Sequence, residues 1–271
     1  MPNEDVALTR ILAVGDVVGR PGRESFRKLY PVIRSREEID FCIVNAENAA
    51  GGSGITPSAA DELLGSGADV LTSGDHVWRK REVAELFGTE RRLLRPANFP
   101  PGAPGRGSLV AGLPGGGKIA VISLLGRVFM EPVDCPFRAL ESELALLAGK
   151  ADVIVVDFHA EATSEKAALA RHFAGRVSAV VGTHTHVPTA DERILSGGTG
   201  FITDIGMCGS LDSILGRDPS PVIERLRTCR PIRFPVCSVD PGLQGVILEC
   251  DRKSGRTVAL RRLELRLEEE F

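Results

Sequence analysis

The chain has 271 residues, of which 43% are hydrophobic and 25% charged, and its formal net charge is −3. This composition is typical of a globular protein with a sizeable core. It lacks the excess of basic residues that a dedicated nucleic-acid-binding protein would show. No apolar run approaches the roughly 20 residues of a membrane-spanning helix. The six cysteines are scattered without a Cys-x-x-Cys pair, and Met1–Asp5 lacks a signal-peptide pattern, so we expect reduced thiols and a cytoplasmic location.

Short apolar runs that end in polar residues or glycine recur along the chain, and each predicts a strand. In chain order these predicted strands are 9–14, 40–44, 69–72, a brief one at 92–94, 119–125, 152–157, 178–181 and 200–203. Segments with helical spacing of apolar residues lie between them, at 21–36, 80–87, 140–147 and 164–173. A further helix is predicted from Thr56 and Pro57, which suit the N-cap and the first helical position.

The rest of the chain adds a loop and a terminal group of strands. Residues 99–107 are rich in proline and glycine and predict a surface loop. Strands are predicted at 236–239, 244–250 and 257–267, the last with leucines alternating with charged residues. Alternation of strands and helices over most of the chain favours an α/β architecture, and an apolar face on the terminal strands would permit a homo-oligomer.

Polar residues that bind metals well follow almost every predicted strand. They are Asp16, Glu47 with Asn48, Asp75 with His76, His159, His184 with His186, and Asp204. Four of the five histidines in the chain fall at strand ends in this way, whereas His172 is expected within a helix. Side chains just past the carboxyl ends of strands line the ligand crevice of an α/β sheet, so we expect these residues to meet.

The types of residue in this set indicate a metal centre. His184 and His186 are two residues apart, so in extended chain their rings project to the same side. Three carboxylates (Asp16, Glu47 and Asp75), one amide and up to four imidazoles exceed the three or four ligands of one zinc ion. They suit two ions about 3.5–4 Å apart that share a carboxylate. Mixed oxygen and nitrogen donors without thiolate favour iron or manganese, with zinc as another choice.

In their order along the chain, these motifs resemble those of the calcineurin-like metallophosphoesterases. The matching motifs are Gly15-Asp16, Asn45-Ala46-Glu47-Asn48, Gly74-Asp75-His76, His159 and Gly182-Thr183-His184-Thr185-His186. Within that superfamily the chain is most similar to the bacterial YmdB-type cyclic-nucleotide phosphodiesterases, because 45–52, 95–98 and 204–207 resemble signatures of that subgroup. The resemblance covers about residues 8–250. It implies one domain over 1–271, folded as an αββα four-layer sandwich of two mixed β-sheets flanked by helices.

The resemblance also implies a role for each matching residue. The implied metal ligands are Asp16, Asn48 and His186 for one ion, Asp75, His159 and His184 for the other, and Glu47 as the bridge between both. His76 would bind no metal; it would protonate the leaving alkoxide or orient the substrate phosphate. Asn98 and Thr183 would contact the substrate. Asp204 is expected to be structural because the ligand set is already full, and Asp157 either orients a histidine or ends a strand.

The activity implied by the resemblance is hydrolysis of a phosphodiester by a metal-bridging hydroxide, with 2′,3′- or 3′,5′-cyclic nucleotides as substrates. Three positions depart from the superfamily pattern. Val18 replaces a histidine, as it does in the subgroup. Asp75 replaces the usual asparagine and should hold its ion more tightly. Arg79 stands where relatives often have an acid.

Other functions remain open at this level. One is a metal-binding regulatory or scaffold protein with little turnover, to which the Asp75 and Arg79 departures would point. Another is a phosphomonoesterase or nuclease of the same superfamily. A metal-dependent amidohydrolase also uses clustered histidine and aspartate, but its histidine pair follows an early strand, whereas His184 and His186 come late in this chain.

Overall fold

The computed structural model describes residues 8–270. Met1–Asp5, the segment without a signal-peptide pattern, lies outside the described residues. The first of two mixed sheets has seven strands in the order β2-β11-β12-β1-β3-β4, with β13 beside β12. Its strands are β1 (Leu8–Val14), β2 (Asp16–Val17), β3 (Phe41–Asn45), β4 (Val70–Thr72), β11 (Met207–Ser210), β12 (Pro241–Asp251) and β13 (Thr257–Arg266).

The second sheet has six strands in the order β5-β6-β7-β8-β10-β9. Its strands are β5 (Ser108–Gly112), β6 (Lys118–Leu125), β7 (Val153–His159), β8 (Ala179–Thr183), β9 (Arg193–Leu195) and β10 (Thr199–Ile202). Each sheet contains a run of parallel neighbours: β1, β3 and β4 in the first, and β6, β7, β8 and β10 in the second. Parallel neighbours deliver their carboxyl ends to one edge of each sheet.

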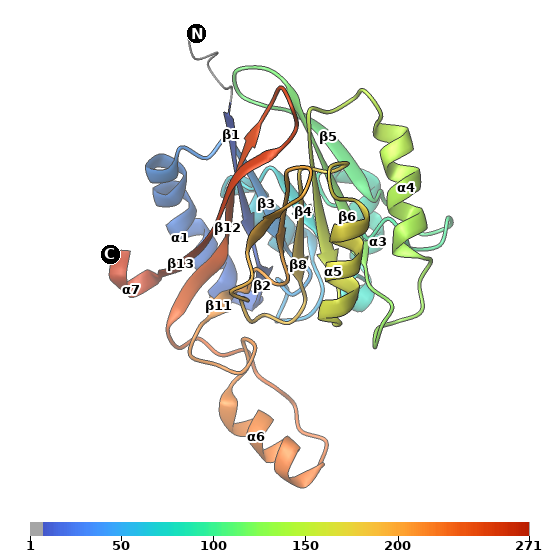
Figure 1. Cartoon of the computed structure of the whole chain (residues 1–271). Coiled ribbons are helices and arrows are strands. Elements are labelled where there is room, and N and C mark those ends of the chain that lie inside the picture. The colour runs from blue at the N-terminus through green and yellow to red at the C-terminus, as the bar shows by residue number, and fades with distance from the viewer. Residues whose placement is uncertain (1–7, 271) are drawn as a thin grey trace.

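Helices cover the outer face of each sheet (Figure 1). Their bounds are α1 (Gly19–Glu37), α2 (Pro57–Gly65), the 3₁₀ turn η1 (Val77–Arg79), α3 (Val83–Thr89), α4 (Pro136–Leu147), α5 (Thr163–His172), α6 (Pro219–Thr228) and α7 (Leu267–Glu270). Buried side chains of α1, α2 and α3 pack on the first sheet, and those of α4 and α5 pack on the second. No helix within residues 8–270 combines the length and apolar character needed to cross a membrane.

A third core lies between the two sheets. Ile11 and Ile43 of the first sheet pack in one cluster with Val155 and Val181 of the second, and all four are buried. Strands that are buried on both faces have continuous apolar runs, which is why residues 153–156 are all apolar. The layers are therefore helix, sheet, sheet, helix, and the predicted αββα sandwich is confirmed.

Some elements differ from the sequence prediction. Residues 92–94 form isolated bridges rather than a strand, with Leu93 opposite Leu71 and Leu94 opposite Arg106. Residues 236–239 likewise give a single bridge, because Val236 pairs with Arg217 at a turn. Helix α6 was not predicted, since its prolines resemble a loop; in fact they occupy its first turn, where proline is tolerated.

Residues 211–240 leave the first sheet after β11 and return to it at β12, and we call this segment the arm. Its helix α6 stands away from the four layers (Figure 1). Asp218 caps α6, because its carboxylate accepts a hydrogen bond from the Ser220 N–H at 3.1 Å. Val222 is buried, whereas Ile223 and Leu226 on the same helix are exposed. The arm therefore packs against the body through only part of its surface.

Candidate metal centre

Both sheets deliver polar side chains to a common edge. Asp16 opens β2 directly after β1, and Glu47 and Asp75 follow β3 and β4. From the second sheet, His159 is the last residue of β7 and His184 follows β8. The sequence prediction that these strand-end residues meet is confirmed by their contacts. The edge is thus built where the parallel strands of two facing sheets end.

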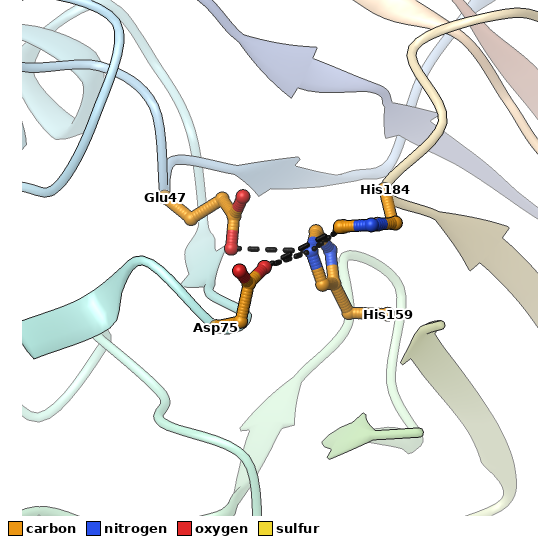
Figure 2. Close-up of side chains that lie close together, drawn as sticks. All are labelled: Glu47, Asp75, His159 and His184. Atoms are coloured by element: carbon orange, nitrogen blue, oxygen red, sulfur yellow. Dashed lines mark hydrogen bonds and ion pairs between the residues drawn. The ribbon is translucent and has the colours of Figure 1, made fainter. Parts of the chain in front are cut away.

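Four of these residues form the most compact group (Figure 2). Ligand atoms of Glu47, Asp75, His159 and His184 all lie within 4.8 Å of one another. His159 Nε2 is 3.2 Å from Glu47 Oε2 and 3.1 Å from Asp75 Oδ1. His184 Nδ1 is 3.4 Å from Asp75 Oδ1. Gly74 permits this approach, because a Cβ there would clash with the His159 ring.

The remaining predicted ligands lie beside Glu47, on the other side of its carboxylate. Asn48 Nδ2 donates to Glu47 Oε1 at 2.9 Å and lies 3.1 Å from His186 Nε2. His186 Nε2 is 3.7 Å from Asp16 Oδ1. Glu47 therefore contacts both sets of side chains, which is the position expected of a residue that bridges two ions.

The hydrogen bonds of His186 fix its tautomer. Nδ1–H donates to the carbonyl of Leu215 at 3.2 Å, so Nε2 carries the lone pair that faces Asn48 and Asp16. Burial lowers the pKa of His186 to about 4, which keeps the ring neutral near pH 7. A neutral imidazole whose other nitrogen is held by a carbonyl is the usual form of a histidine metal ligand.

His159 is oriented by a buried relay. Its Nδ1 lies 3.0 Å from Thr183 Oγ1, and the Thr183 hydroxyl donates to Asp157 Oδ1 at 2.7 Å. Nδ1–H therefore points away from the centre, and Nε2 points into it. Burial by itself lowers the pKa of His159, but the Glu47 and Asp75 carboxylates outweigh burial and raise that pKa to about 10. For Asp157, this geometry favours the positioning interpretation over the strand-end turn.

The donor set fits a bound cation. Within residues 8–270, Asp16 Oδ1 is buried and has no hydrogen-bond partner. Burial raises the pKa of Asp16 well above its usual range, which reflects the cost of a charge held away from water. Coordination of a metal ion would remove this cost, because the cation would both satisfy the oxygen and balance its charge. Glu47 and Asp75 add two further carboxylates to the same centre.

His76 lies at the solvent side of the centre. Its Nδ1 is 2.8 Å from Asn48 Oδ1 and 3.2 Å from Glu47 Oε1, whereas Nε2 is 3.6 Å from Asp75 Oδ2. The hydrogen bond to Glu47 raises the pKa of His76 above its ordinary value, so the ring holds its proton more strongly. A partly exposed, protonated imidazole can donate a proton to a substrate atom.

Two residues predicted to contact substrate lie elsewhere. Asn98 binds the backbone of β6, because its Nδ2 donates to Leu125 O at 2.7 Å and its Oδ1 accepts from Leu125 N at 2.9 Å. Thr183 is fully buried between His159 and Asp157. Both side chains are thus engaged within the fold, and their role in substrate binding stays a prediction.

The loop that carries the histidine pair has a strained backbone. The φ angles of His184 and His186 are 104° and 61°, which residues other than glycine seldom adopt. Between them, Thr185 N–H donates to Asp204 Oδ2 at 3.0 Å, and Asp204 Oδ2 also accepts from Lys166 Nζ at 2.9 Å. The prediction that Asp204 is structural agrees with these contacts.

Sequence reasoning missed two residues near the centre. Lys166 was not singled out, because a lysine within an alanine-rich helix resembles a solvent-exposed residue; here it is fully buried. Glu161 was also passed over, although its Oε2 is 3.1 Å from His184 Nε2. Its position two residues after His159, at the end of a strand, was an available signal. Both residues fix the histidine loop from the α5 side of the second sheet.

Several known proteins are similar to this chain in sequence and fold. A family model described as "YmdB-like protein" matches residues 12–263. The chain is 45% identical over 254 residues to the 2′,3′-cyclic-nucleotide 2′-phosphodiesterase of Bacillus subtilis (strain 168), covering 94% of this chain and 96% of that protein. A crystal structure of a hypothetical protein from Thermus thermophilus has 40% identity and a TM-score of 0.89, covering 95% of this chain and 99% of that one. A novel phosphatase from Mycoplasma pneumoniae has 32% identity and a TM-score of 0.90, covering 96% and 94%.

Proposed function

Because the chain belongs to the YmdB-like protein family, we propose that it is a metal-dependent phosphodiesterase that hydrolyses 2′,3′-cyclic nucleotides. The matched family model confirms the resemblance predicted from the motifs. The main observation in support of the activity is the convergence of Glu47, Asp75, His159 and His184 within 4.8 Å beside a cavity. The substrate class follows from the name of the Bacillus subtilis relative.

We assign two metal ions to the centre. Asp16, Asn48 and His186 would hold one, and the other would take Asp75, His159 and His184, with Glu47 shared between them. Oxygen and imidazole donors without thiolate favour iron or manganese. When bound, such a pair would offset the charge of the phosphate and lower the pKa of a water molecule. A cytoplasmic location and a homo-oligomer stay predictions.

The chain's own residues would position the substrate and move a proton. In the overall reaction, the oxygen of water bonds to phosphorus, a proton of that water passes to solvent, and the bond from phosphorus to the ribose 2′ oxygen breaks. That oxygen leaves as an alkoxide, which receives a proton from His76 Nε2, so that the product is a nucleoside 3′-monophosphate. Solvent returns a proton to His76 after turnover. Asn48 Oδ1 lies 2.8 Å from the other nitrogen of His76 and restrains the ring, which lines the cavity and has its Nε2 3.6 Å from Asp75 Oδ2. The Thr183 and Asp157 relay keeps His159 in its ligand tautomer.

A direct experiment uses the purified chain loaded with Mn²⁺ or Fe²⁺. The loaded protein should convert 2′,3′-cyclic AMP to 3′-AMP, and the conversion is monitored by ³¹P NMR. His76→Ala should keep its metal content while the rate falls about 10²- to 10⁴-fold, because the proton donor is lost. His172→Ala, an exposed residue of α5, is the matched control and should leave the rate unchanged.

Two outcomes would contradict the proposal. Loss of metal from His76→Ala would show that His76 acts as a ligand and that the assigned role is wrong. Tightly bound metal with no hydrolysis of any phosphodiester would favour the regulatory alternative, to which Asp75 in place of asparagine had pointed.

A further inference from the structure

A cavity of about 390 Å³ connects the metal centre to the arm. One side of it is formed by residues of the centre, including Glu47, His76 and His186. Residues of the arm form the opposite side: Ile214, Leu215, Arg217, Val222 and Phe234. Four of these five arm residues are apolar, and the fifth, Arg217, is a cation. This wall therefore suits a ligand that has both a flat apolar group and a negative charge, as a nucleotide does.

We propose that the arm is the nucleoside-binding wall of this site and that the base of the substrate stacks on Phe234. The proposal rests on the proposed function, because it places the phosphate at the metal centre and the base on the other side of the same cavity. Every base has a flat π-face that can stack on an aromatic side chain, so this wall would accept both purine and pyrimidine nucleotides.

The ring of Phe234 is held for such a contact. The Arg225 guanidinium carbon lies 5.4 Å from the centre of the Phe234 ring, which is a cation–π contact within the arm. Phe234 is only half-buried and also lines the cavity. A ring that is backed by a cation on one side loses little conformational freedom when a base packs against it.

Arg217 fixes the arm relative to the metal centre. Its Nη1 donates to Phe234 O at 3.3 Å and to Gly51 O at 3.4 Å, and its Nη2 donates to Gly52 O. A Cβ at position 52 would clash with this guanidinium, and Gly52 has a φ of 81°, so a glycine is required there. Gly51 and Gly52 lie four and five residues after Glu47 in sequence. Arg217 therefore sets the distance from the bridging carboxylate to the Phe234 wall.

The opposite flank of the centre is a poorer place for the base. A second cavity of about 320 Å³ lies there, formed by Phe129, Met130 and Glu131 beside Asp75 and His184. The Phe129 side chain is 89% exposed, so it offers no enclosed surface. Glu131 adds a carboxylate to that flank. Glu161 also lines the first cavity, but the arm residues that line it include Arg217 and no acid.

The test compares two substrates that differ only in the base. They are 2′,3′-cyclic AMP and methyl β-D-ribofuranoside 2,3-cyclic phosphate, which has no base. Phe234→Ala should lower kcat/KM about tenfold for the nucleotide, mainly through KM, and leave the base-free substrate unchanged. Phe234→Leu keeps an apolar side chain and should give the same selective loss if Phe234→Ala fails to fold. Leu226→Ala, 75% exposed on α6 and outside the cavity lining, is the matched control.

A second measurement separates this proposal from the proposed function. Calorimetric titration of the full chain with adenosine 3′-monophosphate should show about tenfold weaker binding to Phe234→Ala, with inorganic phosphate binding unchanged. If the wild-type chain hydrolyses neither substrate, the proposed function fails, and this titration still decides the base site. Equal losses for both substrates would overturn the proposal, and so would a base-selective loss caused by Phe129→Ala.

Discussion

The hydroxyl of Thr183 has two hydrogen-bonding roles in the buried relay. It accepts from His159 Nδ1 at 3.0 Å and donates to Asp157 Oδ1 at 2.7 Å. Because a hydroxyl has one proton, donation to Asp157 obliges His159 to supply the other proton from Nδ1. Near pH 7 the raised pKa of about 10 keeps a second proton on Nε2, so an ion would displace that proton and use Nε2 as its ligand atom. A side chain that would bind no ion thus decides which nitrogen His159 could offer to one.

We therefore expect Thr183→Val to weaken metal binding without unfolding the protein. Valine has the same shape but neither accepts from His159 nor donates to Asp157, so both partners lose a buried hydrogen bond. Changes of this kind typically reduce metal affinity 10- to 100-fold. The measurement is competition for Mn²⁺ with a fluorescent chelator.

Thr185→Val is the matched control for that experiment, because the Thr185 hydroxyl bonds only within the histidine loop, to Val187 O at 3.4 Å. Circular dichroism should show that both variants fold. Unchanged Mn²⁺ affinity in a folded Thr183→Val protein would mean that the relay does not set the tautomer of His159.

The residues of the centre could be predicted from the sequence because each follows an apolar run. Asp16, Glu47 and Asp75 follow strands of one sheet, and parallel strands must deliver their ends to one edge. The arm residues were not accessible in this way. Arg217 reaches the centre through the backbone of Gly51 and Gly52, which are more than 160 positions away in sequence, and no local pattern marks that contact.

At the scale of elements, the histidine loop depends on a buried ion pair. Lys166 of α5 and Asp204 after β10 are both fully buried, 2.9 Å apart. The second role of Asp204 is to accept the Thr185 N–H, between the two residues with positive φ. Helix α5 thereby holds the loop in a conformation that its own sequence does not favour.

Removing one member of this pair should be costly. Lys166→Met leaves the Asp204 charge buried without its cation, and breaking such a pair costs about 3–5 kcal/mol. We expect a loss of that size in the free energy of unfolding of the metal-free protein, measured by urea denaturation. Lys166→Met combined with Asp204→Asn should lose less than the sum of the single changes, because neither charge is then left alone.

The pair of Arg193 and Asp191, 3.1 Å apart, provides the control, because the Arg193 side chain is exposed and that of Asp191 is half-buried. Arg193→Ala should cost less than about 1 kcal/mol, because water screens exposed ion pairs. A loss for Lys166→Met as small as that for Arg193→Ala would contradict the structural role given to the buried pair.

The sequence predicted the elements of the layers better than those of the periphery. Strands β1, β3, β6, β7 and β8 were found within one or two residues, because each is a long apolar run buried on both faces. Strand β5 (Ser108–Gly112) was missed, since it lies at the sheet edge and is only half-buried. Helix α6 was missed because the prolines of its first turn resemble a loop.

At the scale of the whole molecule, the candidate metal centre takes its side chains from both sheets. Asp16, Glu47 and Asp75 come from the first sheet, whereas His159 and His184 come from the second. The sheets are otherwise held together by the apolar core between them. Bound ions would therefore connect the two sheets through polar ligands, at the edge where carboxylates replace the apolar side chains of that core.

We expect removal of metal to lower the stability of the entire fold. A ligand that binds only the folded state stabilises it by about 4 kcal/mol at a thousandfold excess over its Kd. The melting temperature should thus rise with Mn²⁺ concentration and fall with EDTA, as measured by calorimetry. Asp16→Asn removes one buried charge, so it should raise the melting temperature of the metal-free chain and reduce its response to Mn²⁺. A melting temperature independent of Mn²⁺ would contradict binding at this centre.

A hydrogen bond from His186 Nδ1 to Leu215 O joins a proposed metal ligand to the wall of the cavity. A nucleotide that shifts Leu215 would change how firmly His186 holds its ion. Thermodynamic reciprocity then requires the ion to change nucleotide affinity by the same factor. The affinity of this protein for a nucleotide would therefore depend on the metal concentration, and its affinity for the metal would depend on the nucleotide concentration.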